Sequence, residues 1–317
     1  MKLCLYFLLV LLISACAAGL PQGRYGDTEI FFNSSGTVVV QYYALRLVGQ
    51  IVTWGPGWLW DEDCGAQSSW APGELRENTF TGLVTCSYGE FQWSEQIWVG
   101  DDYILVEICI EASTDTSFED VAWIIGLPIQ SFSGGKITAV MPYGGAQDVT
   151  LRAEYISGEA SLGPGSQGAG WVLPFGTNVG LVTTIFSDVS LNGPYLDITD
   201  DREWNGTTYG VRHILYSGSD RLLMKPGDKF VFYIYLQPYI EADQLENMKR
   251  RILDVVYLLN RGLKAEGISK YIIAGRLEAA AKEAQSQQQT LLAVYAVVAA
   301  AVITVLVYLT RKSARLK

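Results

Sequence analysis

The chain contains a single histidine, His213, among its 317 residues. This scarcity excludes zinc sites built on several histidines, and a Ser-His-Asp triad would have to use His213. The sequence also lacks the G-x-S-x-G motif that presents a nucleophilic serine. Because His213 lies in the strand-like run Tyr209–Tyr216, we expect a structural or surface histidine, with a catalytic acid or base as the alternative. The sequence assigns no catalytic residue.

Charged residues are also scarce, at 18% of the chain, and acidic residues outnumber basic ones to give a net charge of −10. This balance argues against nucleic acid as a partner. Hydrophobic residues make up 49% and aromatic residues 12%, which excludes disorder as the main state. Without the predicted signal peptide, membrane span and tail described below, about 270 residues remain, enough for one large core or two small ones.

Five cysteines are too few for a fold built mainly on disulfides. Cys64 lies in a loop-like acidic segment and Cys86 at the end of a predicted strand, so we predict a disulfide between them. Cys109 has the pattern of a buried strand thiol. The alternative is that all three remain reduced.

The N-terminus has the features of a secretory signal peptide over residues 1–18. Lys2 supplies the positive start, an apolar run of about a dozen residues follows, and Ala15-Cys16-Ala17 resembles a cleavage site. Two alternatives remain open. The segment could be an uncleaved anchor, or the lipobox-like Ile13-Ser14-Ala15-Cys16 could direct lipidation of Cys16.

The most apolar stretch of the chain is 291–310, which contains no charge, Pro or Gly. About 20 such residues in a helix match a ~30 Å hydrocarbon core, so this stretch predicts a transmembrane helix in a lipid bilayer. The basic tail 311–317 would be cytoplasmic. The sequence therefore predicts a single-pass cell-membrane protein with the rest of the chain outside, where Asn33 and Asn205 match the N-glycosylation pattern.

Residues 19–240 are rich in short runs of β-branched and aromatic residues separated by Gly, Asn, Pro and Asp. Hydrophobic and polar residues alternate clearly in Glu90–Val99, and Lys229–Gln237 has a similar period of two. Strands at this spacing, with turns between them, predict a large antiparallel β-sandwich. No helical pattern separates the strands, which argues against a parallel α/β fold.

The composition changes after Pro238, and residues 241–290 predict a helical stalk. Hydrophobic residues of Glu241–Gly262 keep heptad spacing for about two heptads, which is too short to establish a coiled coil. A helix packed on the sandwich is the alternative for this part. The Ala/Glu/Lys-rich end of 268–289 resembles a helical spacer, and oligomerisation through the stalk is a further hypothesis.

A loop rich in tryptophan and carboxylates is the main candidate site. Aromatic rings can stack on sugars, carboxylates can accept hydrogen bonds from hydroxyls, and two carboxylates ~5–9 Å apart could act as acid and base. The alternative is tryptophans buried at a strand end beside solvated acids. The candidate carbohydrate-binding residues are Trp58, Trp60, Asp61, Glu62, Asp63 and Trp70.

A second acidic segment is a candidate calcium site. It places four acids within seven residues, and such oxygen-rich loops can bind Ca²⁺, although the EF-hand pattern is absent. Arg202, in the same segment, would repel a cation, so an exposed acidic loop is the alternative. The candidate ligands are Asp197, Asp200, Asp201 and Glu203. Calcium apart, the sequence indicates no cofactor.

Residues 28–240 resemble the β-supersandwich domains of galactose-mutarotase-like and polysaccharide-lyase proteins. The resemblance lies in the strand patterns of Phe118–Pro128 and Leu223–Phe232. It implies a sandwich fold and contact with glycans. The paired catalytic histidines of mutarotases have no counterpart here, because His213 is alone. The resemblance therefore implies a fold and not an activity.

Three functions are compatible with these features. The first is a membrane-anchored cell-surface protein whose sandwich is a binding or structural envelope module that contacts glycans. The second is a glycan-active hydrolase or lyase that uses the carboxylates of Asp61–Asp63. The third is an accessory subunit of a membrane complex. The missing catalytic constellation favours binding over catalysis.

Overall fold

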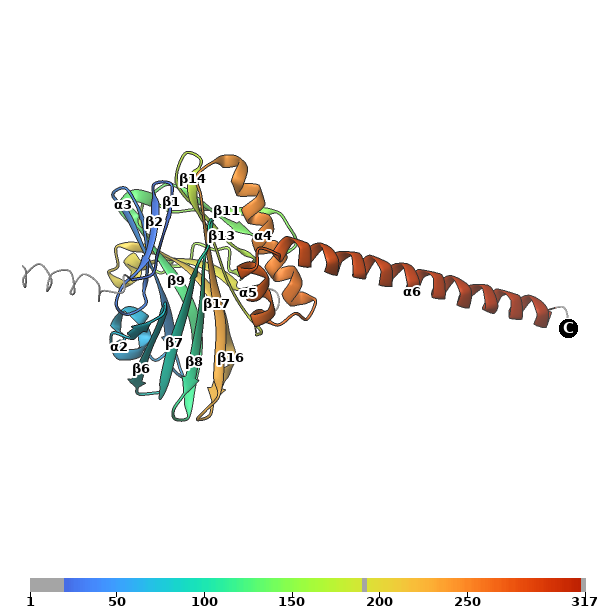
Figure 1. Ribbon diagram of the computed structural model, residues 1–317, viewed down its shortest axis with the longest axis horizontal. Coiled ribbons are helices and arrows are strands. Elements are labelled where there is room, and N and C mark those ends of the chain that lie inside the picture. Colours follow the sequence, from blue (N-terminus) through green and yellow to red (C-terminus); the bar gives the residue numbers. More distant parts are fainter. Residues whose placement is uncertain (1–19, 190–192, 315–317) are drawn as a thin grey trace, which may run out of the picture.

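The computed structural model of the chain describes residues 20–189 and 193–314, and the strands in this part form two antiparallel sheets (Figure 1). Sheet 1 has eight strands, with β4 and β9 near its centre. Its order is β1 (Gln22–Tyr25), β2 (Thr28–Phe32), β3 (Val38–Tyr42), β4 (Leu45–Trp54), β9 (Thr116–Pro128), β16 (Thr208–Met224), β15 (Tyr195–Asp200) and β12 (Ser166–Gln167).

Sheet 2 has nine strands in the same part of the chain and ends in a hairpin at one edge and a meander at the other. Its order is β11 (Ala146–Thr150), β10 (Lys136–Val140), β13 (Gly170–Gly176), β14 (Val179–Ser187), β17 (Lys229–Tyr239), β8 (Ile104–Ala112), β7 (Gly89–Val99), β6 (Thr79–Cys86) and β5 (Glu74–Arg76). The predicted β-sandwich is thus confirmed.

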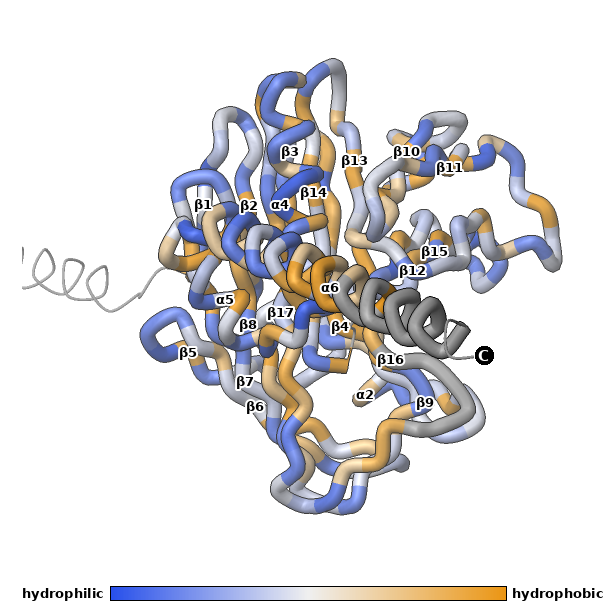
Figure 2. Tube along the Cα trace, turned by 90° about the vertical axis from the view of Figure 1, so that its right-hand side faces the viewer, coloured by the Kyte–Doolittle hydropathy of each residue, from blue (hydrophilic) through white to orange (hydrophobic). Residues whose placement is uncertain are grey.

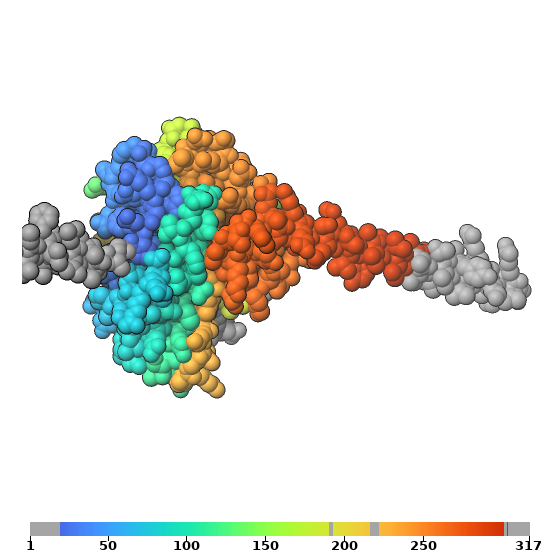
Figure 3. All heavy atoms as spheres, in the orientation of Figure 1, coloured from blue at the N-terminus to red at the C-terminus, as the bar shows by residue number. Residues whose placement is uncertain are grey.

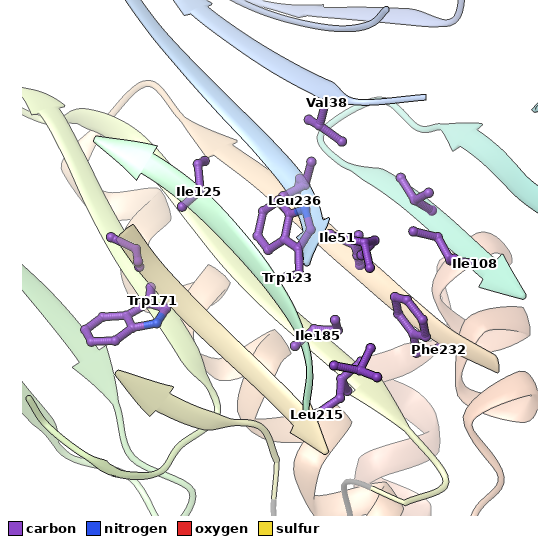
Figure 4. Packing of buried hydrophobic residues seen from close by; sticks show 14 of the residues in the cluster. Val38, Ile51, Ile108, Trp123, Ile125, Trp171, Ile185, Leu215, Phe232 and Leu236 are labelled. Carbon is purple, nitrogen blue, oxygen red and sulfur yellow. The ribbon is translucent and has the colours of Figure 1, made fainter. Parts of the chain in front are cut away.

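The two sheets pack face to face because alternate residues of each strand are apolar and point into the same core. In Figure 4, Ile51 and Trp123 of sheet 1 lie opposite Phe232 and Leu236 of sheet 2. All four side chains are 1% exposed or less. The inner faces of both sheets therefore form one continuous hydrophobic core.

Three helices cover the outer face of sheet 2: α4 (Ala242–Asn260), α5 (Ala265–Ile273) and the start of α6 (Leu277–Ala314). The buried side of α4, which includes Met248 and Ile252, packs against apolar residues of β14 and β17. Figure 3 shows these helices lying against the sandwich, and Figures 1 and 2 show α6 leaving it. The molecule therefore has two sheet layers and one helical layer.

The prediction of a transmembrane helix at 291–310 is wrong. The apolar stretch continues α6, and no helix in the described part of the chain is long and apolar enough to cross a membrane. The predicted single-pass anchoring and cell-membrane location are corrected accordingly.

The remaining helices are single turns that connect strands. They are α2 (Glu62–Gly65), η1 (Gln67–Ser69), α3 (Ile129–Phe132) and η2 (Asp201–Trp204). Figure 1 places α2 and α3 at opposite ends of the sandwich. The predicted signal peptide at 1–18, including Cys16, and the last residues of the tail at 315–317 lie outside the described residues.

Candidate functional site

The outer face of sheet 1 brings polar side chains from four neighbouring strands together. Trp54 of β4 pairs with Asp120 of β9, and Arg212 of β16 pairs with Asp197 of β15. The register of β4, β9, β16 and β15 places these four residues on the same side of the sheet, because successive residues of a strand point to opposite sides. Their neighbours in each strand, such as Trp123, point into the core.

Four tryptophans gather near Arg212 on this face, two of them in contact with it and two against Trp54. The ring of Trp54 lies 6.2 Å from Trp58 and 6.0 Å from Trp60, centroid to centroid. The Arg212 guanidinium lies 5.6 Å from the ring centroid of Trp54 and 6.0 Å from that of Trp204. Trp58, Trp60 and Trp204 are 55%, 49% and 58% exposed. We call Trp54, Trp58, Trp60, Trp204 and Arg212 the tryptophan face.

Trp58 has an unusual backbone conformation. Trp58 has φ +62°, a left-handed conformation that bulky residues rarely adopt. A side-chain carboxylate oxygen of Glu119 accepts a hydrogen bond of 3.1 Å from the amide of Gly57 and fixes the preceding turn. Such strain persists where the surrounding structure enforces it, often at ligand sites. Trp60 lies over Gly65, where a Cβ would come within 2.7 Å of the ring.

Asp120 is the unusual carboxyl group of this face. Its side chain is 1% exposed, and burial raises its pKa to about 7, although the positive charge of Arg212 works in the opposite direction. Within the described residues, Oδ1 of Asp120 and Nε of Arg212 are buried and have no hydrogen-bond partner. Both atoms therefore keep unused hydrogen-bonding capacity beside the tryptophan face.

Two further carboxyl groups lie near Arg212. Asp197 accepts a hydrogen bond of 2.8 Å from Ser161, and Asp201 accepts hydrogen bonds from Thr199 and Thr208. Burial raises the pKa of both groups, and Arg212 opposes the shift in each case. The arginine thus faces several acids whose protonated form is favoured by burial.

The residues of the predicted site in the Trp58–Trp70 loop do not all lie at the surface. Trp58 and Trp60 are exposed, whereas Trp70 is buried in the core, where its Nε1 donates to the carbonyl of Cys64 at 3.2 Å. Asp61 begins α2 as its N-cap and also accepts a hydrogen bond of 2.9 Å from the amide of Ser87. That bond lowers the pKa of Asp61. Its carboxylate therefore has a structural role.

Glu62 and Asp63 are exposed in the first turn of α2. Cys64 is buried beneath them and forms the predicted disulfide with Cys86, which is confirmed. Cys109 is the free cysteine of the described residues and is half-buried. The disulfide ties the loop that carries the tryptophans to the end of β6.

The four predicted calcium ligands face different partners. Asp200 pairs with Arg202 at 2.6 Å, and this hydrogen-bonded contact lowers the pKa of Asp200. Glu203 accepts hydrogen bonds from Tyr155 and from the amide of Gly158. Asp197 and Asp201 are held as described above. Among the described residues, no group of three or more His, Cys, Asp or Glu is arranged to hold a metal ion.

The two predicted glycosylation residues have different surroundings. The side chain of Asn33 accepts hydrogen bonds from the amides of Ser35 and Thr37 and is part of the β2–β3 turn. Asn205 is exposed after η2 with φ +61°. Glycosylation of either residue stays a prediction.

Sequence reasoning missed four residues of this face: Trp54, Asp120, Trp204 and Arg212. Trp54 was visible as the end of a predicted strand, and Trp204 stood beside the acidic segment. Their proximity depends on strand order, in which β9 lies between β4 and β16. A buried acid within the apolar strand β9 was the one signal available, because such groups are rarely buried without a role.

Comparison with known proteins gives similarity in fold alone. No family model and no curated protein matches the chain. Among solved structures, a galactose mutarotase related enzyme from Lactobacillus acidophilus is 8% identical, with a TM-score of 0.42 over 71% of this chain and 99% of that one. A galactose mutarotase-like protein from Lactobacillus casei is 10% identical, with a TM-score of 0.40 over 69% and 100%.

An alpha-mannosidase from Enterococcus faecalis is 8% identical, with a TM-score of 0.42 over 73% of this chain and 30% of that one. The mutarotase-like structures are of the group that the sequence resembles. At these scores the likeness concerns the arrangement of the sandwich, and nothing about activity follows from it.

Proposed function

We propose that the tryptophan face binds carbohydrate. The observation that carries this proposal is a run of neighbouring rings: half-exposed Trp58 and Trp60 lie against Trp54. Arg212 lies against both Trp54 and half-exposed Trp204, and the buried carboxyl group of Asp120 is close to its charge. Flat aromatic rings can cover the apolar faces of sugar rings. An arginine and a carboxyl group can meet the hydroxyls between those faces. We do not propose a membrane-anchored function for this protein.

A direct test is titration of the purified full-length protein with a panel of oligosaccharides and polysaccharides, followed by isothermal calorimetry and thermal melting. A ligand that binds only the folded state raises its stability by RT ln(1 + [L]/Kd), about 2.7 kcal/mol at a hundredfold excess over Kd. Trp204→Ala should weaken binding about tenfold, because a lost aromatic contact is worth ~0.5–1.5 kcal/mol beyond its buried area.

The matched control is Tyr143→Ala, which removes a ring that is 89% exposed in the turn between β10 and β11. It should leave carbohydrate binding unchanged. If both variants bind equally well, or if no member of the panel binds the wild type, the proposal fails.

A second candidate function is a glycan-active enzyme in which Asp120 transfers a proton. The observation that favours it is the pKa of about 7, because a group with such a pKa can both donate and accept a proton near neutral pH. This assignment replaces Asp61–Asp63, since Asp61 is an N-cap with a lowered pKa.

Release of new reducing ends, or mutarotation followed by polarimetry, would test the second candidate. Asp120→Asn should abolish turnover and retain binding, whereas Asp63→Asn, in the exposed turn of α2, should leave turnover unchanged. Turnover that survives in Asp120→Asn would exclude Asp120 as the proton carrier. Binding without turnover in the wild type would leave the binding function alone.

A further inference from the structure

A pocket lies at the opposite end of β4 from the tryptophan face. It measures about 480 Å³ and opens between the β3–β4 turn, α3 and the β13–β14 hairpin. Because β4 runs ten residues from Leu45 to Trp54, its two ends are ~30 Å apart at ~3.3 Å per residue. This pocket is therefore separate from the proposed carbohydrate site. Its volume is within the range of small-molecule sites.

Aromatic rings from separate elements line this pocket. Tyr42 lies 5.8 Å from Phe175 and 4.8 Å from Tyr43 between ring centroids, and the buried Phe132 of α3 also contributes to the wall. Tyr42 ends β3 in sheet 1 and Tyr43 follows it in the β3–β4 turn, whereas Phe175 belongs to β13 in sheet 2. The pocket thus lies where the two sheets separate, and its walls come from both.

Tyr43 occupies a position that tyrosine normally avoids. It is the first of two residues in the loop between Tyr42 and Leu45, and its φ is +48°. Hairpin loops of this length place Gly, Asn or Asp where φ is positive. The Tyr43 hydroxyl is held by Asp27, and its carbonyl accepts from the side chain of Gln41. Strained residues that are held in this way often serve ligand binding.

The charge of the pocket is opposite to that of the whole molecule. Lys136 lines the pocket, and none of the residues that line it is a carboxylate, although the chain carries a net charge of −10. Within the described residues, Lys136 forms no ion pair. A ligand that fits this wall has a flat ring for the aromatic side chains and an anionic group for the ammonium.

We propose that this pocket binds a small aromatic carboxylate, with its ring against Tyr42, Tyr43 and Phe175 and its carboxylate at Lys136. The proposal does not depend on carbohydrate binding at the tryptophan face. It assigns a purpose to Tyr43 at a position where glycine would adopt the positive φ without strain.

The experiment compares phenylacetate with phenylacetamide, which has the same shape and no charge. Both are titrated into the full-length protein and followed by ligand-observed NMR and calorimetry. We expect phenylacetate to bind about three- to fivefold more tightly, as for a partly exposed ion pair worth up to ~1 kcal/mol. Lys136→Met should remove this preference, and Lys136→Arg should retain it.

The Tyr43→Gly variant distinguishes a loss of ligand binding from a loss of folding stability. Glycine adopts φ +48° without strain, so the melting temperature should stay the same or rise, while phenylacetate binding falls about fivefold or more through loss of the ring. Trp204→Ala is the control and should leave phenylacetate binding unchanged. The proposal is overturned if neither probe binds, if both bind equally, or if Tyr43→Gly binds as well as the wild type.

Discussion

At the scale of single residues, His213 gives this protein an acid-sensitive core. The side chain is fully buried between the sheets, and its Nε2 lies 2.8 Å from the hydroxyl of Thr183 in β14. Burial lowers the pKa of His213 to about 3, compared with about 6.5 in an unfolded chain. The unfolded state therefore binds one more proton between these two pH values, and stability contributed by the neutral imidazole is lost as pH falls through them.

We expect the wild type to lose about 2–3 kcal/mol of unfolding free energy through this group between pH 6.5 and 4.5, at ~1.4 kcal/mol per pH unit. His213→Gln can keep a hydrogen bond with Thr183 and cannot be protonated. Urea unfolding of both proteins at several pH values checks this expectation. A stability difference that stays constant with pH would show that His213 is not the source.

The pH dependence of stability expected from Asp120 is opposite in sign to that expected from His213. Its folded pKa of about 7 is raised above the usual 3.8, so its contribution is fully present below pH 3.8 and is lost as pH rises through 7. Asp120→Asn should therefore gain stability relative to the wild type between pH 5 and 7, by about 1.4 kcal/mol per unit. Chemical unfolding at pH 5, 6 and 7 measures the difference, with Asp63→Asn as an exposed control. No relative gain would mean that the carboxyl group is already ionised at pH 5.

At the scale of elements, Gln67 of η1 links the β2–β3 turn to β7 by donating to the carbonyl of Ser35 at 3.3 Å and to Glu95. Glu95 is fully buried, accepts a hydrogen bond of 3.1 Å from Gln67, and has its pKa raised by burial. Gly36 lies against it with φ +75°, and a Cβ there would come within 1.9 Å of the Glu95 carboxylate. This turn therefore requires glycine for both its backbone angle and its space.

Gly36→Ala should destabilise the fold by about 3 kcal/mol or more, since it combines backbone strain with overpacking of the core. The matched control is Gly144→Ala. Gly144 also has a positive φ, +85°, but its Cβ would meet nothing within 4 Å, so only the strain of ~1 kcal/mol remains. Thermal or urea unfolding compares the two. Equal losses would mean that contact with Glu95 adds nothing.

The disulfide between Cys64 and Cys86 also acts at the scale of elements, because it joins α2 to the end of β6. Cys64 and Cys86 are separated by 22 residues, and replacing both with alanine should cost about 3 kcal/mol in the chain-entropy description. Cys109→Ser is the control. It should change stability much less, because Cys109 is half-buried and unpaired with another cysteine. A double variant as stable as the wild type would mean that packing alone holds the tryptophan loop.

For the whole molecule, alternation of residue type predicted the strands and the sandwich because each strand has one side in the core. Strand order could not be predicted in this way, since β4, β9 and β16 are neighbours through contacts between distant parts of the chain. That is why Trp58 and Trp60 were identified from sequence, whereas Asp120 and Arg212 were not. The apolar stretch 291–310 predicted a helix correctly, but its apolar character did not determine what surrounds it.

Helix α6 has two parts, of which the first packs against α4 and α5 and the second is exposed where the structure describes its side chains. Leu277 and Ala281 are buried against α4 and α5, and the Tyr257 hydroxyl donates to Gln288 at 3.0 Å. Beyond that point the described apolar side chains, such as Val297 at 69%, are exposed. Folding of the sandwich should therefore depend on the first turns of α6 and not on the remainder.

A chain that ends at Gln289 should melt within about 1 °C of the full-length protein. A chain that ends at Arg276 should melt about 4–12 °C lower, because it loses burial of Leu277, worth ~2–3 kcal/mol, at ~2–4 °C per kcal/mol for a domain of this size. Calorimetry on the three chains gives the comparison. A large loss in the chain ending at Gln289 would show that the outer part of α6 finds a partner that stabilises the fold, and the apolar residues from Leu291 onward would be its binding surface.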